Sequence, residues 1–401
     1  MTIAPGQRIV ATADSAGRLV AIPVNSPTPG QRVVSVAAST GKSVAIPVTS
    51  PTPGQRIVAI PGSLGKLVAV YSGAGGPTPP AGMWTARYGH AAVTLSDGSI
   101  VLMGGSSGGS EVWRSTNNGL TWIEQTASAS WGPRWGHTAS VMTDGSIILT
   151  GGYSPSIPGV LNDVWRSTDK GVTWIQRTAS APWAGRMGHS AIVGPTGTLL
   201  YIMAGNTASE TYYNDVWVSS DYGATWTEKT PSAGWSIRTG ACAAGFPDGS
   251  FVLTCGGYYE YFSGSGGYWE LVYYNDTWNS TDQAVTWVQQ SYGFSGTKRA
   301  GAAQAILSDG SLVVLGGLYT YYSAPPSPVP TYDYLNDVWR TANEGSTWTS
   351  QSTGLFPARS QFPALVMADG SLIILGGGTA TGALNDVWRS TDKGVTWTQI
   401  R

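Results

Sequence analysis

Apolar and polar positions follow one block order along residues 84–401, and the order occurs six times. Read loosely, each copy has an apolar run, Asp-Gly-Ser, a second apolar run, Gly-Gly and a variable segment, with Thr196-Gly197 in place of Asp-Gly in the third copy. It closes, in its fullest form, with Asn-Asp-Val-Trp-Arg-Ser-Thr-Asp-x-Gly-x-Thr-Trp. Short apolar runs between glycine-containing turns predict strands. In the first copy we expect strands over 90–95 and 100–103, joined by Asp97-Gly98 as a tight hairpin.

Two further strands are expected in each copy, one over Asp-Val-Trp-Arg and one after the closing Thr-Trp. Four strands in each of six copies, without a helical pattern, predict an all-β fold and a six-bladed β-propeller. The last copy ends with its fourth strand, so we expect no blade built from both ends of the repeat region. The closing tryptophans are spaced 49 to 61 residues apart, at Trp122, Trp174, Trp226, Trp287, Trp348 and Trp397.

Residues 1–71 carry a shorter repeat. The sequence Pro-Gly-Gln-Arg recurs with a period of 24, starting at Pro5, Pro29 and Pro53. Each copy reads as strand, polar turn and strand, so three β-hairpins are predicted. Because an isolated hairpin is marginally stable, we expect this module to anchor the protein to a particle or to form a homo-oligomer. Residues 72–83 are rich in Gly and Pro and are predicted to be a linker before the propeller at 84–401.

The repeats resemble two known families. The Gly-Gly doublets with downstream tryptophans are similar to kelch repeats, and 167–174, 219–226 and 390–397 match Ser-x-Asp-x-Gly-x-Thr-Trp, the Asp-box (BNR) motif of sialidase-like propellers. Asn117 and Asn343 replace the Asp in two copies, and Ala284 replaces the Gly in another. The resemblance implies a propeller, with the Asp box as a turn between outer strands far from any active centre. It does not imply an activity, because both motifs occur in enzymes and in binding proteins.

Composition and charge limit the classes of partner that the protein is expected to bind. The net charge is −1 and only 11% of residues are charged, which makes nucleic acid an unexpected partner. No apolar run is long enough to cross a bilayer, and the first ten residues lack the charged and apolar regions of a signal peptide. Abundant Gly, Trp and Tyr favour a protein of a virion or extracellular surface, reached without a cleaved signal.

Propeller connectivity places the Asp-Gly turns and Asp boxes on one face and the variable segments on the other, where we expect function. Two variable segments, 258–274 and 318–335, are rich in tyrosine. Large amphipathic side chains of this kind bind sugars or protein surfaces. The alternative is that they fold the loops onto each other or fill a subunit contact. The predicted ligand-binding residues are Tyr258, Tyr259, Tyr261, Tyr268, Trp269, Tyr319, Tyr321, Tyr322, Tyr332 and Tyr334.

One arginine recurs in every copy and invites comparison with the arginine triad that holds a carboxylate in sialidases. The six are Arg87, Arg134, Arg186, Arg238, Arg299 and Arg359. Six equivalent positions instead favour a blade-to-blade strut, and no Tyr–Glu nucleophile pair of that family can be placed here. We therefore predict no catalytic residue.

All three histidines, His90, His137 and His189, occupy one position in the first three copies. Three histidines could ligate zinc, but a hydrogen bond at the start of the first strand is the favoured role. We predict no metal and no cofactor.

The two cysteines flank the Asp248-Gly249 turn. If 247 pairs with 250, Cys242 lies opposite Cys255, within reach of a disulfide. A bulge near Cys255 would prevent it, and both outcomes stay open at this point.

The favoured function is non-enzymatic recognition: a particle appendage whose propeller binds a glycan or a surface protein. The alternatives are a sialidase-like glycoside hydrolase, for which Glu260, Glu270 and Asp333 would be the acids to test, and a structural coat or filament protein. Residues 161–174 and 384–397 are identical in sequence, which favours a structural coat or filament protein. The sequence does not identify the ligand, the particle or the oligomeric state.

Overall fold

The computed structural model describes residues 9–13, 19–23, 57–61, 67–71 and 82–401, except 108, 263–267, 292, 295, 323–329 and 353. The chain divides into two units, Met1–Pro77 and Thr78–Arg401. The first unit contains two antiparallel hairpins, β1 (Ile9–Ala13) with β2 (Leu19–Pro23) and β3 (Ile57–Pro61) with β4 (Leu67–Tyr71). These are the first and third predicted hairpins, and the second lies outside the described residues. Among the described residues no helix is long and apolar enough to span a bilayer.

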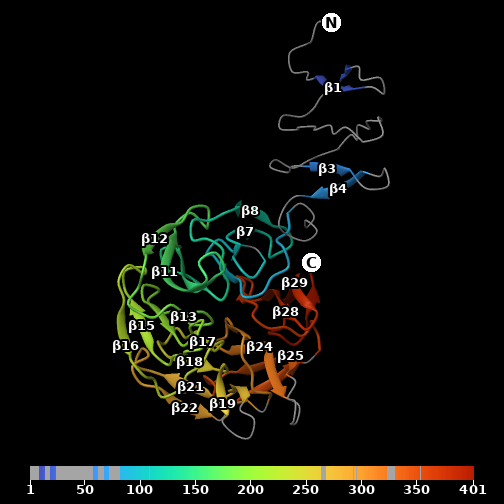
Figure 1. The fold of residues 1–401 in the computed structure, drawn as a ribbon. Coiled ribbons are helices and arrows are strands. Elements are labelled where there is room, and N and C mark those ends of the chain that lie inside the picture. Colours follow the sequence, from blue (N-terminus) through green and yellow to red (C-terminus); the bar gives the residue numbers. More distant parts are fainter. Residues whose placement is uncertain are drawn as a thin grey trace. The chain divides into compact units, whose positions relative to one another are not determined.

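Six four-stranded antiparallel sheets form the second unit, and Figure 1 shows them arranged around a common centre. Blades 1 to 3 consist of β5 (Ala91–Thr94), β6 (Ile100–Met103), β7 (Val112–Ser115) and β8 (Ile123–Thr126); β9 (Thr138–Val141), β10 (Ile147–Ser154), β11 (Gly159–Ser167) and β12 (Ile175–Thr178); and β13 (Ser190–Val193), β14 (Leu200–Met203), β15 (Val216–Ser219) and β16 (Thr227–Thr230). Blades 4 to 6 consist of β17 (Cys242–Gly245), β18 (Phe251–Thr254), β21 (Thr277–Ser280) and β22 (Val288–Ser291); β23 (Ala303–Ile306), β24 (Leu312–Tyr322), β25 (Pro330–Thr341) and β26 (Thr349–Ser352); and β27 (Ala364–Val366), β28 (Leu372–Thr379), β29 (Gly382–Ser390) and β30 (Thr398–Gln399). The predicted all-β, six-bladed fold is confirmed.

The turn between the first two strands differs from the expected tight hairpin by one residue. In blade 1 Thr94 pairs with Ile100, and Leu95 donates its N–H to the carbonyl of Ser99 at 2.8 Å. Three residues therefore form the loop, with Gly98 at a φ of +78°. This is the geometry in which a type I turn is followed by a left-handed glycine. The Ser99 N–H donates to Asp97 Oδ1 at 3.0 Å, which explains the recurrent Asp-Gly-Ser.

The turn between the third and fourth strands is built by the Ser-Thr-Asp-x-Gly-x-Thr-Trp segment. In blade 2 the N–H of Gly171 donates to the hydroxyl of Ser167, and the N–H of Thr173 donates to Asp169 Oδ1. The indole N–H of Trp174 donates to the carbonyl of Gly171 at 3.2 Å. The aspartates of these turns thus hold local structure, as expected from the sequence, on the face opposite the variable segments.

The ring closes without a strand shared between blades 1 and 6. The first strand of each blade contacts the first strands of both neighbours, β27 and β5 included. Trp84, Trp122, Leu375 and Val387 belong to one buried cluster between blades 6 and 1. Blade 1 therefore packs directly against blade 6, as the phase of the repeats predicts, and backbone hydrogen bonds such as that from Arg87 to Leu384 add to the contact.

A ring of six backbone hydrogen bonds runs once around the channel mouth. Gly136 donates its N–H to the carbonyl of Gly89 at 2.8 Å, and each equivalent residue donates to its counterpart in the preceding blade. The members are Gly89, Gly136, Gly188, Gly240, Gly301 and Gln361, with φ between +54° and +65°. Such φ values favour glycine, which explains the Arg-x-Gly that starts the copies.

Candidate functional site

The six repeated arginines are structural. Each has at most 2% of its surface exposed. Arg186 forms a two-pronged ion pair with Asp215, at 2.7 and 2.8 Å, and donates to the carbonyl of Ala204 at 2.9 Å. Its guanidinium carbon lies 4.4 Å from the centre of the Tyr213 ring. Because all these partners belong to blade 3, the side chain braces its own blade and not the contact between blades.

The same brace recurs around the propeller. The other pairs are Arg87–Glu111, Arg134–Asp163, Arg238–Asp276, Arg299–Asp337 and Arg359–Asp386. The link to the neighbouring blade is made by the main chain: the carbonyl of each arginine accepts a hydrogen bond from the preceding blade's Gly-Gly doublet, as Arg186 does from Gly152. The blade-to-blade strut expected from the sequence is therefore corrected. No guanidinium of this set is left to hold a ligand carboxylate.

The three histidines are buried where adjacent blades meet. Burial lowers the pKa of His137 and His189 to about 3 and the pKa of His90 well below its usual range, with neighbouring guanidinium groups adding to the shift. All three rings are therefore neutral at physiological pH. Within the described residues no group of three or more His, Cys, Asp or Glu could hold a metal ion.

The Gly-Gly doublet makes room for these rings. A Cβ on Gly104 would lie 2.5 Å from Cε1 of His137, a side chain of the next blade. A Cβ on Gly105 would lie 2.8 Å from Cβ of His90 in the same blade. The doublet and the histidine are thus two halves of one contact between blades.

The six copies vary together at this contact. Where the first doublet position is glycine, the next blade supplies a ring; where it is Ala204 or Cys255, the next blade supplies Ala241 or Ala302. The glycine–ring pairs are Gly104 with His137, Gly151 with His189, Gly316 with Phe362 and Gly376 with His90. The repeat is therefore complementary across every junction between blades.

Residues 76–257 match the KLHDC2/KLHL20/DRC7 Kelch-repeats domain. This part of the six-bladed β-propeller is thus similar to kelch repeats. The solved structure entitled "Structure of YjhT" shares the fold, with a TM-score of 0.63 at 19% identity over 80% of this chain and 99% of that one. No curated protein matches the chain. The likeness to Asp-box propellers stays a prediction from sequence.

The two cysteines of the propeller do not pair as the sequence register predicts. The three-residue turn places Cys242 opposite Thr254, while Cys255 adopts a φ of +62° at the doublet position. Both cysteines are free and buried. A hydrogen bond with Cys255, together with burial, raises the pKa of the Cys242 thiol. The two thiols therefore fill core space that histidine–glycine contacts fill in other blades.

The two tyrosine-rich segments form β-hairpins on the variable face. In blade 4, β19 (Gly257–Phe262) pairs with β20 (Tyr268–Tyr273), and in blade 5 the hairpin is an extension of β24 and β25. The two hairpins touch: the hydroxyls of Tyr273 and Thr320 lie 2.8 Å apart, and the rings of Tyr273 and Tyr319 lie 5.3 Å apart. Part of the tyrosine cluster therefore holds the hairpins together, which is the structural alternative considered from the sequence.

The predicted site residues separate into four groups. Tyr258 stacks on Tyr274, and Tyr319 packs against blade 4, so both have intramolecular partners. Tyr321 and Tyr332 are 47% and 54% exposed. Tyr259 and Tyr334 are partly buried. The side chains of Tyr261, Tyr268, Trp269 and Tyr322 lie outside the described residues.

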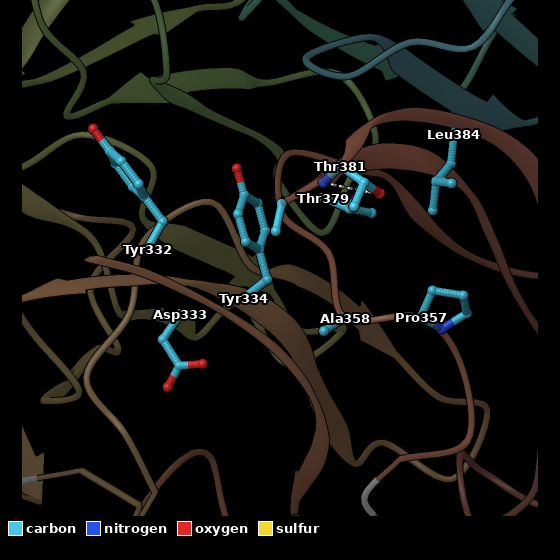
Figure 2. Close-up of a pocket in the computed structure, with 9 residues that line it drawn as sticks. Tyr332, Asp333, Tyr334, Pro357, Ala358, Thr379, Thr381 and Leu384 are labelled. Carbon is cyan, nitrogen blue, oxygen red and sulfur yellow. Dashed lines mark hydrogen bonds between the residues drawn. The ribbon is translucent and has the colours of Figure 1, made fainter. Parts of the chain in front are cut away.

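A hollow of about 340 Å³ lies where the blade 5 hairpin meets blade 6. Tyr332 and Tyr334 project from one side of β25 and Asp333 from the other, as Figure 2 shows. Pro357, from the loop before blade 6, and Thr379 and Thr381 complete the lining together with Ala358, Ala380 and Leu384. The two tyrosines of this hollow are among the residues predicted from the sequence, whereas the threonines are not, because the short blade 6 turn carries no aromatic residue.

Proposed function

We propose that this protein is a non-enzymatic recognition protein whose propeller binds a glycan or a surface protein through the tyrosine-rich face formed by the loops of blades 4 to 6. The observation that carries the proposal is the hollow beside Tyr332 and Tyr334. Exposed aromatic side chains around a concave surface are typical of binding sites. The kelch-type propeller supports the same role, because its repeated residues build the scaffold and leave the variable face free.

Three features favour binding over hydrolysis. The repeated guanidinium groups are occupied by carboxylates of the protein. A hollow between the first strands of several blades is lined by Ala, Val, Thr, Ser, Ile and Leu, such as Ala92, Thr94 and Ser140. A glycoside hydrolase would place two carboxyl groups about 5–10 Å apart around its substrate. Among the residues lining the hollow, Asp333 is the one acid.

The setting that we propose is the surface of a virion or another extracellular particle, with residues 1–71 as the anchoring or oligomerising module. The support is the repetition of that module and its apolar strands, such as Ile57–Pro61, which need a covering partner. Mass measurement of the full-length chain tests this part, since a stable assembly is expected. A free monomer without affinity for any particle would overturn it.

The binding proposal is tested by applying the full-length chain to a glycan array and recording both retention and cleavage. Retention without cleavage, lost in a Tyr332→Ala Tyr334→Ala variant that unfolds at the wild-type midpoint, is the expected result. Cleavage would establish the glycoside hydrolase alternative. Absence of retention, together with capture of a surface protein that the same variant loses, would establish the protein branch. If the protein neither retains a glycan nor captures a surface protein, the alternative of a structural coat or filament protein would remain.

A further inference from the structure

A line of aromatic side chains continues from the hollow across the variable face. Tyr88 lies beside the hollow. It packs against Gly378, the residue before Thr379, since a Cβ added to Gly378 would contact Cβ and Cγ of Tyr88. Burial raises the pKa of the Tyr334 phenol, and the neighbouring phenols of Tyr332 and Tyr88 raise it further. These three tyrosines therefore share one neighbourhood, although they come from blade 5 and from the loop that precedes blade 1.

The line extends into blade 2. The rings of Tyr88 and Trp135 have centroids 6.4 Å apart in an edge-on arrangement, and those of Trp135 and Tyr153 are 5.4 Å apart. Trp135 and Tyr153 are also joined by two backbone hydrogen bonds of 3.1 and 2.9 Å, so their positions are fixed. Tyr88 is 37% exposed, and the rings of Trp135 and Tyr153 are partly exposed. We call these five residues, Tyr332, Tyr334, Tyr88, Trp135 and Tyr153, the aromatic track.

The chemistry of the track selects among ligands. An aromatic face and a rim of hydroxyl groups complement a sugar, which offers C–H groups on its faces and hydroxyls at its edge. The hollow at one end carries the hydroxyls of Thr379 and Thr381, and no Lys or Arg lines it. A sialylated or sulfated ligand would therefore find no compensating cation there. A protein anchor would instead need a deep apolar pocket, which this open hollow does not provide.

We propose that the aromatic track binds a linear, neutral oligosaccharide, with one end in the hollow beside Tyr332 and successive sugars lying over Tyr88 and Trp135. The inference rests on the proposed recognition function and specifies its ligand class and direction. One aromatic ring would serve a single sugar, whereas a continuous line from blade 5 to blade 2 fits a chain.

The blade 5 hairpin supplies a matched control. Tyr321 pairs with Thr331 and therefore lies on the opposite face of the hairpin from Tyr332, although the two are exposed to similar extents, 47% and 54%. A ligand in the track contacts Tyr332 and leaves Tyr321 untouched. If instead any exposed tyrosine contributed to ligand binding, replacement of Tyr321 and of Tyr332 would weaken binding equally.

The test measures the affinity of the full-length chain for glucose, galactose and mannose oligomers of one to six units, with sialyllactose as the anionic comparison. We expect affinity to increase with chain length for one neutral series and to be weak for sialyllactose. Tyr332→Ala should weaken binding at every length by about three- to tenfold, the usual contribution of one aromatic contact. Trp135→Ala should weaken only the longer oligomers, Trp135→Phe should restore much of that loss, and Tyr321→Ala should change nothing.

The outcomes separate this inference from the proposed function. Retention on the glycan array that is independent of chain length, or equally sensitive to Tyr321→Ala, would overturn the track and leave glycan recognition standing. Preference for sialyllactose would also overturn it. Capture of a surface protein with no affinity for any oligosaccharide would overturn the track in favour of the protein branch. Unfolding midpoints of all variants show whether a loss of binding reflects a loss of fold.

Discussion

The turn face and the variable face of the propeller use polar residues in opposite ways. On the turn face Asp97 accepts hydrogen bonds from Ser99 and from Lys170 of the next blade, and these bonds lower the pKa of its carboxyl group. On the variable face Tyr332 is 54% exposed and sits on an extended hairpin. One face has satisfied its polar groups within the protein, and the other exposes an aromatic side chain to solvent. This contrast supports our proposal that recognition takes place on the variable face.

The largest expected effect comes from breaking a buried brace beneath both faces. Asp215→Ala leaves the guanidinium of Arg186, which is 0% exposed, without its carboxylate. We expect the free energy of unfolding to fall by about 3–5 kcal/mol. Asp144→Ala is the comparison. It removes a surface pair with Arg166, which is 21% exposed, and such pairs contribute about 1 kcal/mol or less. It also removes the turn hydrogen bond from Ser146, which contributes about 1 kcal/mol. Urea titration of both variants measures the difference, and equal losses would contradict the distinction between brace and surface pair.

The neutral histidines predict a pH dependence that belongs to the contacts between blades. In the folded state the pKa of His137 and of His189 is about 3, below the value of about 6.5 in the unfolded chain. The unfolded state therefore binds more protons below pH 6.5, and stability falls as the pH decreases from about 6.5 towards 3. At pH 5 the expected loss is about 2 kcal/mol for each histidine.

Urea titrations at pH 7.5 and pH 5 measure this dependence. Asp144 and the turn aspartates have lowered pKa values, so they keep their charge in this interval and contribute little. His137→Gln should reduce the difference between the two pH values, whatever its effect at pH 7.5. An unchanged difference in that variant would show that the proton is taken up elsewhere.

The complementarity between doublet and ring predicts a coupling. Gly104→Ala places a methyl group against the ring of His137, in a backbone with φ of +62°. The combination of Ala204 with Ala241 occurs naturally at another junction, so His137→Ala should relieve the clash. A double-mutant cycle should therefore give a coupling of about 1 kcal/mol, since contacting residues are not additive. Additive losses would mean that the backbone conformation alone requires the glycine.

The sequence predicted the fold because the repeats carry it locally. Asp-Gly-Ser and Gly-Gly fix turns in each copy, and the tryptophans mark the closing strands. The sequence register placed Cys242 opposite Cys255, whereas the structure pairs Cys242 with Thr254. A two-residue and a three-residue Asp-Gly turn look alike in sequence, yet they shift every later pair by one. The arginine's partner was missed because Asp and Arg of one brace lie 27 to 38 residues apart in blades 2 to 6.

The proposed binding site was predicted less well, because composition does not show which face of a hairpin meets a neighbour. Tyr319 packs on blade 4 while Tyr332 lines the hollow, although both belong to the same tyrosine-rich segment. Tyr88 and Trp135 were overlooked. They follow the repeated arginine directly, at a position that varies among blades, and variation inside an otherwise uniform motif is the signal that identifies them.

The smallest expected effect sharpens the contrast between the faces most directly. Tyr332→Ala removes an aromatic side chain that is 54% exposed. Among the described residues, no other aromatic ring has its centroid within 6.5 Å of the Tyr332 ring, the largest distance found for the aromatic pairs. We expect the free energy of unfolding to change by no more than about 0.5 kcal/mol, as is usual for surface positions.

Tyr273→Ala on the same pair of hairpins is the comparison. It removes a ring that is 3% exposed, packs on Tyr319 and bonds to Thr320, so its loss should cost about 3 kcal/mol or more. Urea titration of the two variants decides the matter. A loss at Tyr332 as large as that at Tyr273 would make Tyr332 part of the scaffold, and the variable face would then have no residue reserved for a ligand at the hollow.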